Sequence, residues 1–325
     1  MIVNASKRGG EVHYGKIAAV RLFFAIPHFY DPEGGRGYGS MGPDPEPRIA
    51  ALTATIGAVL WHFGPRQYVI DWAQRLAHQA NDVGENVVDI TVCTTQGKHI
   101  LDQLPIPASA YTHVATTAEP MMLGFECQAV LRDVLGEYDY YCFLEDDTVI
   151  RDSWFFSKLA WFTDQYGHDA LLQPNRYAVD FDWGGRKGYG GNVRRERTDP
   201  FQNIDDTPAL TGEVMGRKLV FRRAINPNAA CYFLTEEQMK RWAGRPYFLD
   251  RDTSFAGPIE SAASLGIMRT FKIYKPAAEC ANFLEVEHFG TTLWLVEKES
   301  ADDLPPIALK QFTKVREARR EAASS

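Results

Sequence analysis

Apolar segments of strand length are the feature that most limits the folds open to this chain. Residues 17–26 read IAAVRLFFAI, with one arginine as the only polar residue, and residues 138–144 read YDYYCFL. A strand with one wet face alternates apolar and polar residues, whereas a strand of a parallel sheet covered by helices on both faces is almost continuously apolar. We therefore expect a buried, mostly parallel sheet.

Helical patterns alternate with these strands. Apolar residues recur at helical spacing over 49–63, residues 86–94 have a strand pattern, and residues 124–135 form a helical pattern before the strand at 138–144. We also expect a second helical piece at 68–79. Strand–helix–strand alternation predicts an α/β fold with a doubly wound sheet.

The second half of the chain continues the alternation less regularly. Helices are expected at 154–166, 236–242 and 259–265, and strands at 170–173, 218–221, 229–234 and 269–274. A loop at 183–197, rich in glycine and arginine, interrupts them. We expect a flexible leader at 1–16, a single domain at 17–300 and a helical tail at 301–325.

Composition excludes several classes of protein. The 35 basic and 42 acidic residues give a net charge of −7, which argues against binding a nucleic-acid polymer. Five cysteines without a C-x-x-C pair suggest neither a disulfide scaffold nor a zinc ribbon, so a reduced, cytoplasmic protein is expected. No stretch approaches the ~20 apolar residues of a transmembrane helix. The tail could touch a membrane surface, but its small apolar face favours packing.

An acidic triplet, Glu145-Asp146-Asp147, directly follows the strand at 138–144. Parallel α/β sheets bind ligands beyond the carboxyl ends of their strands. Adjacent carboxylates repel one another, and a divalent cation with oxygen-seeking chemistry relieves that repulsion. The alternative is an acidic turn that begins the next helix.

The triplet resembles the Asp-x-Asp motif of GT-A fold glycosyltransferases, metal-dependent enzymes that use nucleotide sugars, and the chain looks most like their family 2-like members. The resemblance implies a Rossmann-like, mixed but mostly parallel central sheet flanked by helices. It also implies that Asp147, with Glu145, binds Mn²⁺ or Mg²⁺, and that Glu145 and Asp146 lie near the ribose and sugar. Residues 17–150 would form the nucleotide-binding half and residues 151–300 the acceptor-binding half.

Other segments match the same enzymes in order. The resemblance implies that the nucleoside contacts the ends of the first two strands and the start of the following helix: Ile26, Pro27, Phe29, Thr94, Thr95 and Gly124. Arg186 and Lys187 belong to the basic loop, which could close over a diphosphate as a lid; the alternative is a solvated surface loop.

Two downstream residues complete the expected site. Glu260, at a helix start, matches the carboxylate that acts as general base on the acceptor hydroxyl, with Asp252 as the reserve candidate; its alternative role is to stabilise the helix N-terminus. His288 matches the C-terminal histidine that many members supply as a metal ligand, although such a histidine can also be purely structural.

The function implied is transfer of a sugar from a nucleoside-diphosphate sugar to the hydroxyl of a saccharide or other acceptor, with inversion at the anomeric centre. A retaining transferase and a non-catalytic module that binds carbohydrate or sugar nucleotide remain alternatives. A nucleotidyltransferase is disfavoured, because no lysine cluster follows the first strand.

Overall fold

The computed structural model describes residues 19–34, 40–180, 186–190 and 195–290. The chain divides into two compact units, one of residues 1–178 and 189–290 and the other of residues 179–188 and 291–325. The expected leader at 1–16 and tail at 301–325 lie outside the described residues, as does the side chain of Arg186.

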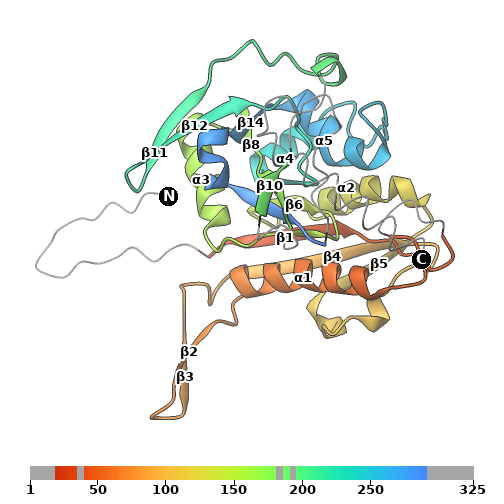
Figure 1. The fold of residues 1–325 in the computed structure, drawn as a ribbon, viewed down its shortest axis with the longest axis vertical. Coiled ribbons are helices and arrows are strands. Elements are labelled where there is room, and N and C mark those ends of the chain that lie inside the picture. Colours follow the sequence, from red (N-terminus) through yellow and green to blue (C-terminus); the bar gives the residue numbers. More distant parts are fainter. Residues whose placement is uncertain (1–18, 35–39, 181–185, 191–194, 291–325) are drawn as a thin grey trace, which may run out of the picture. The chain divides into compact units, whose positions relative to one another are not determined.

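A five-stranded sheet, in the order β13-β6-β1-β4-β5, forms the centre of the first unit (Figure 1). Its strands are β1 (Arg21–Pro27), β4 (Val87–Thr95), β5 (Thr112–Thr116), β6 (Tyr140–Leu144) and β13 (Cys231–Thr235). Four of them run parallel, and β13 pairs antiparallel with β6. The expected mixed α/β class with a mostly parallel central sheet is therefore confirmed.

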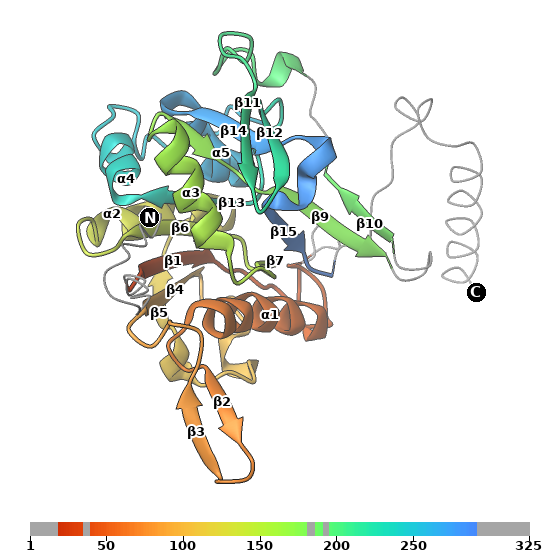
Figure 2. The same ribbon diagram turned by 90° about the vertical axis from the view of Figure 1, so that its left-hand side faces the viewer.

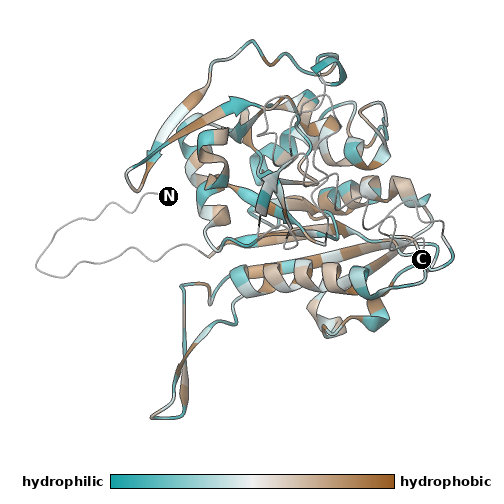
Figure 3. Ribbon diagram, in the orientation of Figure 1, coloured by the Kyte–Doolittle hydropathy of each residue, from teal (hydrophilic) through white to brown (hydrophobic). Residues whose placement is uncertain are grey.

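Helices cover both faces of this sheet. They are α1 (Glu46–Phe63), α2 (Leu123–Asp133), α3 (Phe155–Tyr166), α4 (Glu236–Ala243) and α5 (Pro258–Thr270). Successive side chains of a strand point to opposite faces, and Leu22 and Phe24 join the core with α1 and α3, whereas Phe23 and Ala25 join the core with α2, α4 and α5. This two-sided burial explains the continuous apolar pattern of the first strand, and Figure 3 shows hydrophobic residues along the central strands.

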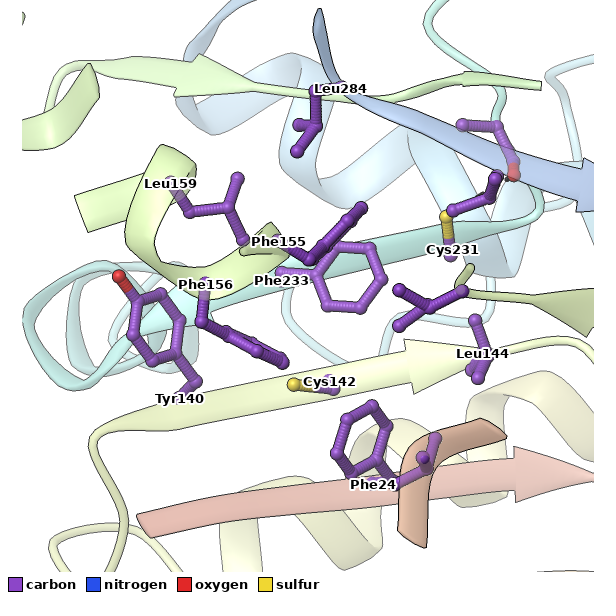
Figure 4. Close-up of a cluster of buried hydrophobic side chains, with 14 of the residues drawn as sticks. Phe24, Tyr140, Cys142, Leu144, Phe155, Phe156, Leu159, Cys231, Phe233 and Leu284 are labelled. Carbon is purple, nitrogen blue, oxygen red and sulfur yellow. Dashed lines mark hydrogen bonds between the residues drawn. The ribbon is translucent and has the colours of Figure 1, made fainter. Parts of the chain in front are cut away.

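The core on the α3 side is dense and aromatic. Phe155 and Phe156 of α3 pack on Phe233 of β13, with ring centroids 4.7 and 5.9 Å apart (Figure 4). Each such side chain gains roughly 1.5–3 kcal/mol when it is fully buried. The packing fixes β6 and β13 side by side, which matters for the residues that follow β6.

Two smaller sheets lie downstream. One has the order β11-β12-β14-β8, and the other contains β9, β15 and β7. Their strands are β7 (Thr148–Val149), β8 (Ala170–Leu172), β9 (Asn175–Asp180), β11 (Leu210–Val214), β12 (Arg217–Arg223), β14 (Lys272–Pro276) and β15 (Glu285–His288); β10 is Arg186–Tyr189. Short 3-10 helices are η1 (Leu101–Gln103), η2 (Ala108–Ala110), η3 (Pro120–Met122), η4 (Arg195–Arg197) and η5 (Ala278–Phe283).

The helix expected at 68–79 is wrong. This segment is a β-hairpin of β2 (Tyr68–Asp71) and β3 (Leu76–Gln79) that extends away from the central sheet (Figure 2). Its aromatic and β-branched residues favour strands, and Arg75 in the turn has a left-handed φ of 56°. Its apolar side chains are exposed, with Trp72 83% exposed, so their spacing does not mark a buried helical face.

All five cysteines are free and buried. Among the described residues, no helix has the length and apolar character needed to cross a membrane.

Candidate functional site

The acidic triplet lies at the carboxyl end of β6, held by backbone hydrogen bonds. The Glu145 amide donates to the carbonyl of Ala230 beside β13 (3.0 Å), and the Thr148 amide donates to the Glu145 carbonyl (3.0 Å). The Phe289 amide donates to the Asp147 carbonyl (2.8 Å). Two segments far away in sequence and one local turn therefore fix the triplet at the sheet edge where α/β proteins bind ligands.

Asp146 is held by two buried side chains. Its Oδ2 lies 2.6 Å from Nδ1 of His28, and its Oδ1 accepts from Nη1 of Arg48 at 2.6 Å. The Ile100 amide donates to Nε2 of His28 (3.3 Å), so in the neutral imidazole Nδ1 carries the proton and donates to Asp146. Both carboxylate oxygens of Asp146 are engaged, which suits it to position its neighbours.

Asp147 has one engaged and one unpartnered oxygen. Oδ2 lies 3.3 Å from Nη1 of Arg48 and 3.6 Å from Nε2 of His288, whereas the buried Oδ1 has no hydrogen-bond partner among the described residues. Burial alone would raise the pKa of Asp147, but His288, Arg48 and Arg176 hold it below its ordinary value. A buried, ionised carboxylate oxygen without a donor is a position for a cation.

The donor set fits a divalent cation that also binds substrate phosphate. No group of three or more His, Cys, Asp or Glu side chains in the described part of the chain is close enough to form a metal site by itself. Mg²⁺-type sites often use only one or two protein carboxylates together with substrate phosphates and water. Asp147 and His288, with Glu145 beside them, provide the small number of protein ligands that such a site needs.

Burial favours the neutral form of Glu145 in the metal-free protein. It raises the pKa of Glu145 to about 8, the nearby charges of Asp147, Asp146 and Glu260 add to the shift, and the charge of Arg176 opposes it. Bound cations favour the ionised form of nearby carboxylates, so a metal at Asp147 would lower this pKa.

The structure brings one of the two base candidates to the triplet. Glu260 lies in the first turn of α5, with Oε2 close to Gly257, and is near enough to raise the pKa of Glu145. Asp252 accepts from the amide of Ser254 (2.8 Å) and lies 3.4 Å from Nη1 of Arg269. Of the two, Glu260 is the one whose charge acts on the triplet, and its role as a base remains a prediction.

Five of the six expected nucleoside contacts lie near the ends of β1 and β4, and the sixth, Gly124, lies in the first turn of α2. Ile26 is buried in the core, so only its backbone can meet a ligand, while Pro27 and Phe29 are half-buried. Thr94 is buried with its hydroxyl 2.7 Å from Nε2 of His113, and the Thr95 hydroxyl donates to the Ala118 carbonyl at 2.5 Å. Their roles toward a nucleoside remain predictions.

Gly124 has a structural reason to be glycine. A Cβ built on it would lie 2.6 Å from Cβ of Ala262, so the residue allows α2 and α5 to approach closely. In the second unit, Lys187 is exposed and belongs to β10. The lid hypothesis for Arg186 and Lys187 remains a prediction, because residues 181–185 and 191–194 lie outside the described part of the chain.

Sequence reasoning named Arg176 only as a residue that could line an acceptor site, and it missed three other polar residues: His28, Arg48 and Lys275. His28 had the clearest signal, because a histidine directly after a buried strand lies at the binding edge of a parallel sheet. Arg48 begins a helix behind two prolines, which gives no sign of its two acidic partners.

Solved structures with a similar fold include two GT-A glycosyltransferases, TarS and GalNAc-T7. They include Staphylococcus aureus TarS 1–349 (TM-score 0.40, 10% identity, 82% of this chain and 60% of that one) and S. aureus TarS (0.41, 10%, 82% and 36%). A third is GalNAc-T7 with UDP, GalNAc and Mn²⁺ (0.43, 7%, 85% and 45%). This chain thus spans 36–60% of the length of those proteins. No known family and no curated protein matches its sequence.

Proposed function

We propose that this protein is a divalent-metal-dependent glycosyltransferase that moves a sugar from a nucleoside-diphosphate sugar to an acceptor hydroxyl, with inversion. One observation carries the proposal: at the carboxyl edge of β6, Asp147 has a buried Oδ1 without a partner among the described residues, while its Oδ2 lies 3.6 Å from Nε2 of His288. Asp147 is the last residue of the acidic triplet, which matches the Asp-x-Asp motif of GT-A enzymes in residue type and in its position after a strand.

Asp147 and His288 would hold the metal, and Glu145 lies beside them. When bound, Mn²⁺ or Mg²⁺ supplies positive charge that stabilises the leaving diphosphate. Arg48 and His28 keep Asp146 and Asp147 in place, so the ligand set is preorganised before the donor arrives.

Glu260 would accept the proton of the attacking hydroxyl. Its place at the start of α5 leaves it half-buried, near the triplet but not hydrogen-bonded to it. Attack on the face of the sugar opposite the leaving diphosphate inverts the anomeric centre. Removal of the hydroxyl proton by a general base raises the reaction rate roughly 10²–10⁴-fold.

A thermal-melting panel tests the donor site. Nucleoside diphosphates are added with and without Mn²⁺ to the wild type, to Asp147→Asn and to the control Asp133→Asn, which changes an exposed acid on α2. We expect one nucleotide to stabilise the wild type and the control only when Mn²⁺ is present, because a metal held by Asp147 would supply the positive charge that attracts the diphosphate.

Asp147→Asn should lose that stabilisation. If no nucleotide stabilises the wild type, or if Asp147→Asn responds like the control, the proposed donor site is wrong. Release of free sugar from the matching nucleotide sugar, measured with Mn²⁺, separates an enzyme from a binding module.

A further inference from the structure

Two cations lie on the β13 flank of the triplet. His28 and Arg48 approach it from β1 and α1, on the opposite flank of β6. Arg176 belongs to β9 and Lys275 to β14, and Nζ of Lys275 donates to the carbonyl of Asn228 (3.1 Å), just before β13.

Two hydrogen bonds bring together the segments that carry these two cations. The Gln173 amide donates to the Tyr274 carbonyl at 2.9 Å, and the side-chain amide of Asn175 donates to the Pro276 carbonyl at 2.9 Å. Lys275 lies between these two contacts, and Arg176 directly follows the second. Both charges act on Cys231 of β13, so both lie near this strand.

Neither cation makes a direct ion pair. In the described part of the chain, Lys275 has only the Asn228 carbonyl as a hydrogen-bond partner, and no hydrogen bond or ion pair of the Arg176 guanidinium is found, although its charge acts on Glu145 and Asp147 at longer range. Of the acids on the adjoining strand β15, Glu287 pairs with Arg151 (2.7 Å) and Glu285 accepts from Tyr189 (2.7 Å). Confined cations without a directly paired carboxylate cost free energy, and a bound anion offsets that cost.

A buried amide beside the pair also has unused hydrogen-bonding capacity. Gln173 is 1% exposed, and neither its Oε1 nor its Nε2 has a partner among the described residues. It follows Leu172, whose register partner is Tyr274, so it is the neighbour of Lys275 across the two strands. Burial and the charge of Arg176 lower the pKa of Lys275 to about 8, which leaves the amine mainly protonated at pH 7.

We propose that Arg176 and Lys275 form a subsite for an anionic group, a phosphate or carboxylate, on the acceptor. The inference rests on the proposed function, which assigns the donor diphosphate to the metal at Asp147. Arg176 also lies near the proposed base, because the charges of Arg176 and of Glu260, in the first turn of α5, both act on Glu145. An acceptor bound there would present its hydroxyl near Glu260 while its charge rests on the two cations.

Thermal melting with glycerol 3-phosphate tests the subsite. The protein is first saturated with Mg²⁺ and the nucleoside diphosphate that stabilises it, and neutral glycerol at equal ionic strength is the reference. We expect glycerol 3-phosphate to raise Tm by a further ~2–4 °C, because a second site remains free.

Arg176→Gln and Lys275→Met should each abolish this further rise, and Lys275→Met should keep the rise caused by the nucleotide. Arg176→Lys, which retains the charge, should restore it, and the control Arg222→Gln, an exposed cation on β12, should leave it unchanged. Without any ligand, Lys275→Met should melt no lower than the wild type, because it removes a confined charge that lacks an acidic partner.

Three results overturn the subsite: no rise with glycerol 3-phosphate, a rise that survives in both neutral variants, or a rise that disappears whenever the nucleotide is bound. The last result would assign the cations to the donor diphosphate. A response to glycerol 3-phosphate without any response to nucleotides would keep the anion site and refute the proposed function instead.

Discussion

At the scale of single residues, Glu145 couples the stability of the protein to pH. Its pKa in the folded, metal-free protein is about 8, against an ordinary value of 4.5. Below about pH 4.5 the group is protonated in both states, so its burial carries no ionisation cost. As pH rises toward 8 the unfolded chain ionises first, and the folded state loses relative stability.

We therefore expect the free energy of unfolding of the metal-free protein to fall between about pH 4.5 and 8, and Glu145→Gln to flatten this fall. At pH 8 the variant should be more stable than the wild type by on the order of a few kcal/mol. Urea unfolding across the pH range measures both. Glu213→Gln, at an exposed site on β11, is the control, and equal pH slopes for Glu145→Gln and the wild type would contradict the expectation.

Glu260 is the residue on which the stereochemical prediction depends. Glu260→Gln should lower the transfer rate roughly 10²–10⁴-fold while nucleotide affinity stays unchanged, because the amide cannot accept the hydroxyl proton. Asp252→Asn should have a much smaller effect, since Ser254 and Arg269 already engage that carboxylate. Steady-state rates and nucleotide titrations measure the two quantities.

A fall of less than tenfold in Glu260→Gln would remove the base assignment. A retaining reaction, with attack from the same face as the leaving group, would then be the better hypothesis. The anomeric configuration of the product, read by NMR, distinguishes these two outcomes.

At the scale of elements, the contact between α2 and α5 depends on Gly124. A methyl group there would meet Cβ of Ala262 at 2.6 Å, closer than two carbon atoms can approach, so the helices must separate. We expect Gly124→Ala to lower the free energy of unfolding by about 1–3 kcal/mol. Adding Ala262→Gly should recover most of the loss in urea unfolding, and a double variant no more stable than Gly124→Ala would show that the clash is not the cause.

Strands and helices that are buried on both sides could be predicted from sequence, and the exposed hairpin could not. Residues of β1 and β6 are apolar because helices cover both faces of the sheet, and that burial leaves an unambiguous pattern. The segment 68–79 has exposed apolar residues, so their spacing reports no buried face. The antiparallel direction of β13 leaves no pattern either, because a strand buried on both faces is apolar whichever way it runs.

At the scale of the whole molecule, part of the candidate site could likewise be predicted from the sequence and part could not. The triplet and His288 follow strands, and the carboxyl ends of parallel strands are recognisable in sequence. Arg48 reaches Asp146 across 98 residues, and Arg176 meets Lys275 only because β9 lies beside the end of β14. Such pairings arise from tertiary packing, to which a single sequence offers no direct guide.

The net charge of −7 is also a poor guide to the ligands that the protein can bind at a particular site. Carboxylates at Asp147 would hold a cation, while cations at Arg176 and Lys275 would hold an anion, within one sheet edge. Local charge can therefore favour phosphate-bearing ligands in a chain that is acidic overall.

Because every cysteine is buried, chemical labelling of the thiols can measure local opening of the folded protein. Burial raises the pKa of the Cys142 thiol well above its ordinary value, and Cys231 and Cys127 behave alike, so folded molecules should react slowly with alkylating reagents. Mass spectrometry should find the intact chain unlabelled in buffer and five adducts in denaturant. Labelling rates at each thiol would then map which layers of the sheet open first, and rapid labelling of the folded protein would contradict the packing described for its core.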